Sequence, residues 1–252
     1  MPTELPKELL ELIFHDLEWN SIKNISVVSF EFLALARGIL FQKVNLFRKP
    51  PRNADDGRAC HTQFFEFLLG DAHVASRIQE LSLHSNKTVD ADEDRQSIAD
   101  NLIRLLPKLT RLKHLSIHSN YYVDWTSQND DLRTAIMQLC LLPQVQSLDL
   151  EFMRLRRREL SLLTSIPKVT LFCIDTTVDP QTTSVEALSP SSSSLSSTKL
   201  QDLTITVKYS ADDLSAIWSI VEAAGSSLTS LRLYSSPYDD GTFPQRSTTK
   251  NN

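Results

Sequence analysis

A short apolar pattern recurs along this chain and limits its possible folds more than any other feature. The two clearest copies are QELSLHSN at 79–86 and KHLSIHSN at 113–120. Aligned with each other, they give the template apolar-x-x-apolar-x-apolar, which returns further along the chain. The middle apolar residues of the copies are Leu81, Leu115, Leu148, Phe172, Leu203 and Leu231, with Val44 in an earlier candidate copy. Successive copies lie 24 to 37 residues apart, so the chain is a series of similar units.

Segments with the apolar spacing of a helix separate these copies, at 64–69, 98–106, 132–142, 160–166 and 214–224. Three of them are followed by Pro107, Pro143 and Pro167, where proline ends a helix and favours extended backbone. One strand and one helix cannot bury their own apolar side, so the units must stack with their strands in a parallel sheet. We therefore expect an α/β fold in the form of a curved solenoid, with strands on the concave face and helices on the convex face.

The two clearest copies resemble the leucine-rich repeat. Ile78 to Asn86 and Leu112 to Asn120 meet its pattern L-x-x-L-x-L-x-x-N in full. The resemblance extends over 77–236 and implies a leucine-rich-repeat solenoid that binds other proteins. The later copies depart from it at the asparagine position, where they carry Met153, Thr177, Lys208 and Ser236.

The N-terminal stretch Leu5 to Leu46 is rich in apolar residues at helical spacing, beginning with LPKELLELIF. It resembles the F-box, the helical module that docks onto the Skp adaptor of cullin-based ubiquitin ligases. The resemblance rests on Leu5-Pro6-x-Glu8-Leu9-Leu10-x-x-Ile13-Phe14-x-x-Leu17, then Val28-Ser29-x-x-Phe32 and Leu40-Phe41. Ser29 stands where many members have cysteine, and Phe32 and Phe41 where many have tryptophan. The adaptor-binding residues that the resemblance implies are Leu5, Pro6, Leu9, Leu10, Ile13, Phe14 and Phe32.

These patterns divide the chain into four parts. We expect an F-box-like helical domain at 1–48, a linker and first helix at 49–76, the solenoid at 77–236 and a disordered tail at 237–252. Within the solenoid, the serine-rich tract at 189–198 is of low complexity and is expected to form a loop.

Composition argues against several classes of function. A formal net charge of -5 creates no general attraction for nucleic acid or an anionic membrane. No apolar run reaches the roughly 18 residues of a membrane helix, and the N-terminus lacks the basic start of a signal peptide. Three distant cysteines and five scattered glycines form no zinc, phosphate or nucleophile motif. We expect a cytoplasmic or nuclear protein that is not an enzyme and needs no cofactor.

Side chains that alternate with the inward apolar residues should face the concave surface. The target-binding candidates on that surface are Glu80, His84, His114, His118, Asp149, Glu151, Asp175, Asp202, Arg232 and Tyr234. Four of these are carboxylates near the centre, which favours a basic segment of a partner there. His84 and His118 should be neighbours, but two histidines do not make a metal site, so no metal is expected.

The resemblances together imply a non-catalytic substrate receptor of an SCF-type ubiquitin ligase. Its F-box would bind a Skp-type adaptor, and through it a cullin scaffold, while the repeats bind a protein target that the sequence does not identify. The alternative is a leucine-rich-repeat interaction module without a ubiquitin role, whose N-terminal helices only cap the solenoid.

Overall fold

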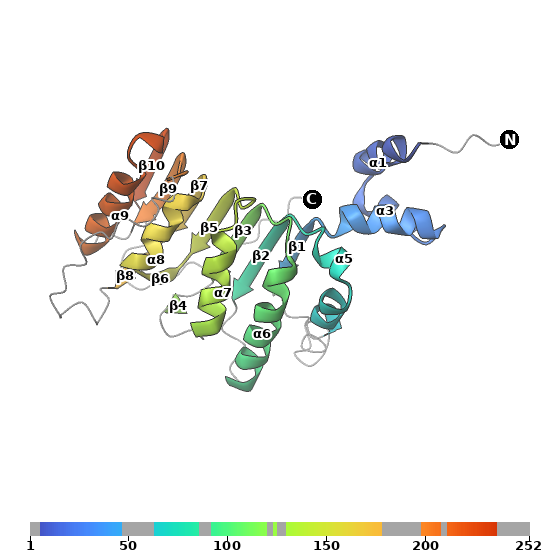
Figure 1. The fold of residues 1–252 in the computed structure, drawn as a ribbon, viewed down its shortest axis with the longest axis horizontal. Coiled ribbons are helices and arrows are strands. Elements are labelled where there is room, and N and C mark those ends of the chain that lie inside the picture. The colour runs from blue at the N-terminus through green and yellow to red at the C-terminus, as the bar shows by residue number, and fades with distance from the viewer. Residues whose placement is uncertain are drawn as a thin grey trace.

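The computed structural model describes residues 6–46, 63–85, 92–119, 123–124, 130–177, 198–207 and 211–235. Leu5, Asn86 and Asn120, nearly all of the serine-rich tract and the tail from 237 lie outside these residues. Figure 1 shows the arrangement, with a row of parallel strands that helices accompany along one side. The α/β class expected from the sequence is confirmed.

Seven strands form the main sheet, in the order β1-β2-β3-β5-β7-β9-β10. Every neighbouring pair is parallel, and each strand of the sheet lies beside the one that follows it in the chain. The strands are β1 (Lys43–Leu46), β2 (Glu80–Ser85), β3 (His114–Ser119), β5 (Ser147–Glu151), β7 (Lys168–Phe172), β9 (Asp202–Val207) and β10 (Ser230–Ser235). The earlier candidate copy of the template is thus a strand, and the described sheet begins with it at Lys43.

Helices lie between the strands at the places that the apolar spacing predicts. They are residues 63–70, α5 (Ala72–Ala75), α6 (Asp92–Leu105), α7 (Asp130–Cys140), α8 (Arg157–Leu162) and α9 (Ala211–Ala224). A 3-10 turn follows three of them, at Leu106–Lys108, Leu163–Ser165 and Gly225–Ser227. Buried Arg133 of α7 forms an ion pair with buried Glu159 of α8 at 3.1 Å, which ties two neighbouring units together.

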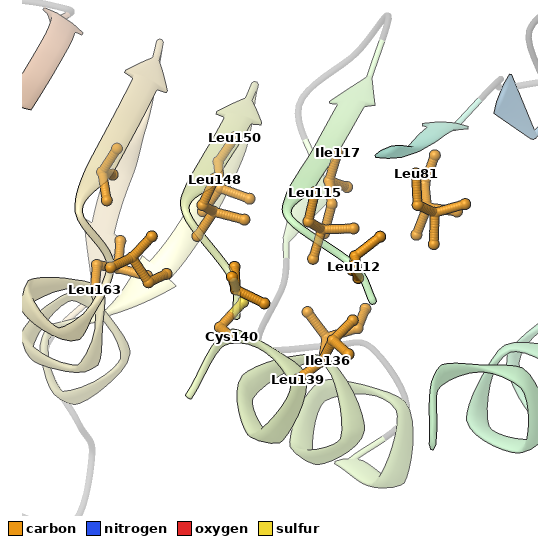
Figure 2. Close-up of a cluster of buried hydrophobic side chains, with 14 of the residues drawn as sticks. Leu81, Leu112, Leu115, Ile117, Ile136, Leu139, Cys140, Leu148, Leu150 and Leu163 are labelled. Carbon is orange, nitrogen blue, oxygen red and sulfur yellow. The ribbon is translucent and has the colours of Figure 1, made fainter. Parts of the chain in front are cut away.

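The template residues form the core between the sheet and the helices. Figure 2 shows Leu115 and Leu148 on neighbouring strands, above Ile136 and Leu139 of α7. The template residues are in register across the sheet, because Leu81 pairs with Leu115 and Leu115 with Leu148. Each of these leucines is at most 1% exposed. Burying such a side chain stabilises the fold by about 1.5–3 kcal/mol, so each copy of the template contributes to the stability of the sheet.

One copy of the template has a different register from the one expected. Val169 pairs with Leu148, and Leu171 pairs with Leu150, so the inward residues of this unit are Ile166, Val169 and Leu171. The prediction had placed Val169, Phe172 and Ile174 there. It was wrong because the sequence fits the template twice, three residues apart, and only pairing with the neighbouring strands selects one fit.

A second, smaller parallel sheet was not predicted. It consists of β4 (Val123–Asp124), β6 (Met153–Arg156) and β8 (Asp175–Thr177), in that order. Phe152 and Cys173 connect β5 to β6 and β7 towards β8, and both have positive φ, 54° and 51°. This backbone conformation is uncommon for residues other than glycine and turns the chain out of the main sheet.

The N-terminal helices have a core of their own. They are α1 (Lys7–Asp16), α2 (Trp19–Ile25) and α3 (Phe30–Leu40), and their buried centre is Phe14, Ile22 and Ala36. The Ser29 side chain accepts a hydrogen bond from the backbone N–H of Phe32, which caps the start of α3. Figure 1 places this three-helix module beside the β1 end of the sheet, away from β10.

Candidate functional site

The face of the main sheet that points away from the helices carries polar side chains in three rows. We call it the polar face. The first row, read across the strands, is Lys43, Glu80, His114, Ser147, Lys168, Asp202 and Ser230. The second row is Asn45, Ser82, Ser116, Asp149, Thr170, Thr204 and Arg232. The third row is His84, His118, Glu151, Phe172, Thr206 and Tyr234. The strand alternation thus brings together all but one of the predicted target-binding residues.

The third row brings three candidate side chains on neighbouring strands into direct contact. The rings of His84 and His118 stack with their centroids 4.8 Å apart. On its other side, Nδ1 of His118 lies 2.7 Å from Oε2 of Glu151, and the two side chains are 30% and 20% exposed. Because a carboxylate only accepts hydrogen bonds, Nδ1 is the ring nitrogen that carries the proton. The contact with Glu151 and the stack with His84 therefore hold the His118 ring in one orientation.

The other two rows also contain bonds between neighbouring strands. His114 Nδ1 lies 2.6 Å from the Ser147 hydroxyl, and the Ser116 hydroxyl donates to Asp149 at 3.3 Å. An exposed ion pair joins Lys43 to Glu80 at 2.9 Å. These bonds hold the side chains in place, so the centre of the polar face is partly ordered before any partner arrives.

The charge of the polar face differs from the expectation in one respect. Asp175 was predicted to lie there, but it belongs to β8 of the small sheet, where it pairs with Arg154. Lys168 takes a place on the face, paired with Ser147 and Asp202. The error follows from the shifted register of that unit. The face is therefore of mixed charge, and the two central carboxylates, Asp149 and Glu151, already accept hydrogen bonds from their neighbours.

The two stacked histidines have no third metal-binding partner in the described part of the chain. The described residues contain no group of three or more His, Cys, Asp or Glu side chains that could hold a metal ion. Glu151 bonds to His118 on the side away from His84. The three side chains therefore lie in a line across the strands and do not surround a common point where a metal ion could bind.

A second candidate surface lies on the N-terminal module. On α1, Leu9 and Ile13 are 46% and 47% exposed, one turn apart on the same side of the helix. Pro6 is exposed and Leu10 is half-buried. Further large apolar side chains are exposed nearby in the chain: Leu12, Val27, Val28 and Phe30. We use the name N-terminal patch for the exposed apolar residues of the module, which are 9, 12 and 13 on α1 and 27, 28 and 30 between and at the start of the next helices.

Two predicted adaptor-binding residues have another role. Phe14 is only 2% exposed and packs against half-buried Phe32, with ring centroids 5.7 Å apart. They hold the three helices together, and Phe14 cannot touch a partner without unfolding. The prediction from sequence did not include Leu12, Val27 and Phe30. The available signal was that a module this short cannot bury so many large apolar side chains.

None of the helices within the described ranges is long and apolar enough to cross a membrane. No family model matches the chain, and a search of curated proteins finds no significant match.

Proposed function

We propose that this chain is a non-catalytic substrate receptor of an SCF-type ubiquitin ligase. The N-terminal module is an F-box-like domain whose exposed patch binds a Skp-type adaptor. The main sheet and its helices are a leucine-rich-repeat solenoid whose polar face binds the protein to be ubiquitinated. The observation that carries the proposal is the exposed apolar surface of a module that already has its own core.

The N-terminal patch supports an adaptor-binding role over a capping role. A cap would bury its apolar side against the first unit of the sheet. Here Val27, Val28 and Phe30 are 84%, 70% and 90% exposed, and the core around Phe14 is separate from the core of the sheet. Large apolar side chains left exposed on a module with its own core favour a protein interaction site.

The contacts between the N-terminal module and the first helix beside the main sheet support a receptor that holds its target in a fixed position relative to the adaptor. Phe41, at the end of α3, packs against Phe64 and Phe67 of the next helix, with centroids 6.5 and 5.4 Å away. Arg37 of α3 forms an ion pair with Asp71 at 3.7 Å. The aromatic cluster and the ion pair join α3 to the helix at 63–70 and to Asp71, which limits bending between the adaptor end and the polar face.

The test is co-purification of the full chain with a Skp-type adaptor. The double variant Leu9→Asp/Ile13→Asp should lose adaptor binding by at least about tenfold, because two carboxylates would be desolvated at the interface. Both side chains are about half exposed, so the variant should keep its helical circular dichroism and its unfolding midpoint.

The matched control is Leu162→Asp, at a half-exposed leucine on α8, outside the N-terminal module. This variant should bind the adaptor as the unmodified chain does. Failure of the unmodified chain to bind any Skp-type adaptor would favour the alternative, an interaction module without a ubiquitin role.

A further inference from the structure

The last described strand, β10, is incompletely covered. It pairs with β9, and no strand among the described residues pairs with its other edge. Its inward residues Leu231 and Leu233 are 40% and 55% exposed, whereas the paired residues Leu203 and Ile205 of β9 are 1% exposed. An apolar surface and a free strand edge thus lie side by side at this end of the sheet.

The backbone of β10 presents a regular set of groups at that edge. The N–H of Ser230 donates to the carbonyl of Gln201, so Ser230 faces the neighbouring chain segment. Because successive residues of a strand alternate, the backbone groups of Leu231, Leu233 and Ser235 point to the open edge. Proline residues and inward-pointing charges usually prevent edge-to-edge pairing of strands. The strand β10 contains neither.

The sequence SLRLYS of β10 is complementary to itself when two copies run antiparallel. With the two-fold axis at Leu233, that residue pairs with Leu233 of the second copy, and Leu231 pairs with Ser235. The backbone N–H and C=O groups of residues 231, 233 and 235 in the two copies then form about six hydrogen bonds across the open edges. On the polar side, Arg232 lies opposite Tyr234 of the second copy, a favourable cation and aromatic pair. An axis at Arg232 would instead place two like charges opposite each other.

We propose that β10 is the interface of a two-fold homodimer in which two main sheets join edge to edge. The apolar faces of both sheets lie on the same side, so Leu233 packs against Leu233 of the second copy and Leu231 lies diagonally across from it. The proposal is independent of the adaptor-binding function, because the N-terminal module lies at the opposite end of the sheet (Figure 1).

The first test is sedimentation equilibrium of the full chain over a range of concentrations. The unmodified chain should show a reversible monomer–dimer equilibrium. Leu233→Lys should weaken the dimer at least tenfold, because two lysines would face each other at the axis, and this exposed side chain can change without unfolding the strand. The control Phe30→Lys, at an exposed residue of the N-terminal patch, should leave the dimer unchanged.

The second test fixes the register by disulfide cross-linking in a Cys60→Ser background. Opposite residues in a non-hydrogen-bonded pair have Cα atoms about 4.5 Å apart, within disulfide reach. A mixture of the Arg232→Cys and Tyr234→Cys proteins should cross-link, and each protein alone should not. Within the described part of the chain, the remaining cysteines are Cys140 and Cys173, and both are buried.

A monomer at every concentration would overturn the proposal, and residues 236–252 or another protein would then be the candidates to cover the edge. Loss of the dimer in Phe30→Lys would also overturn it, because self-association would then use the N-terminal patch. Cross-linking of Arg232→Cys alone would contradict the proposed pairing.

Discussion

Cys140 is a single residue whose burial has a measurable consequence. It ends α7 within the main core, where it is 4% exposed (Figure 2). Burial raises the pKa of its thiol from 9.0 to about 12. Between these values the folded chain keeps a proton that the unfolded chain loses, so this residue lowers the stability of the fold as pH rises above 9.

We expect the free energy of unfolding of the unmodified chain to fall, relative to that of Cys140→Ala, by about 1.4 kcal/mol between pH 8 and pH 10. The variant lacks the thiol, and all other titrating groups are shared, so the difference isolates this residue. Urea unfolding of both proteins at the two pH values measures it. A difference that does not change with pH would mean that the thiol is not desolvated in the folded chain.

Among the elements, β7 is the strand of the main sheet whose register could not be predicted from the sequence alone. The other six strands match the template positions that the apolar pattern indicates, since each has one good fit. In β7, Ile166, Val169 and Leu171 fit as well as Val169, Phe172 and Ile174. The choice depends on lateral pairing with β5 and β9, which is a property of the assembled sheet.

This register can be tested with two alanine variants. Leu171 is 1% exposed in the core, so Leu171→Ala should lower the free energy of unfolding by about 2–5 kcal/mol. Half-buried Phe172 packs edge-on against Phe152, with ring centroids 5.3 Å apart, so Phe172→Ala should cost only about 1 kcal/mol. Urea unfolding gives both values. If Phe172→Ala cost more than Leu171→Ala, the register first expected from the sequence would be correct.

The same distinction applies to the candidate surfaces. The polar face could be derived for six strands because alternation places side chains without knowledge of the helices. The lateral bonds within it, such as His118 to Glu151, could not be derived, because they depend on the pairing of units thirty-three residues apart. Similarly, apolar spacing predicts α1 but cannot separate its buried Phe14 from its exposed Ile13, which only the packing of three helices decides.

For the whole molecule, the two candidate interfaces lie at opposite ends of the sheet and should act independently. The N-terminal patch would bind one adaptor per chain, and β10 would join two chains. A dimer would therefore present two adaptor sites at its far ends, with two polar faces between them. Such an arrangement would increase the effective affinity for a target that is itself dimeric or has two binding segments.

This arrangement predicts the mass of the adaptor complex, measured by light scattering after size-exclusion chromatography. The unmodified chain should form a complex of two chains and two adaptors. Leu233→Lys should yield one chain with one adaptor, because it separates the chains and leaves the patch intact. Leu9→Asp/Ile13→Asp should yield a dimer without adaptor. A variant at one end that abolished binding at the other would show that the ends are coupled, which the separate cores of the module and the sheet argue against.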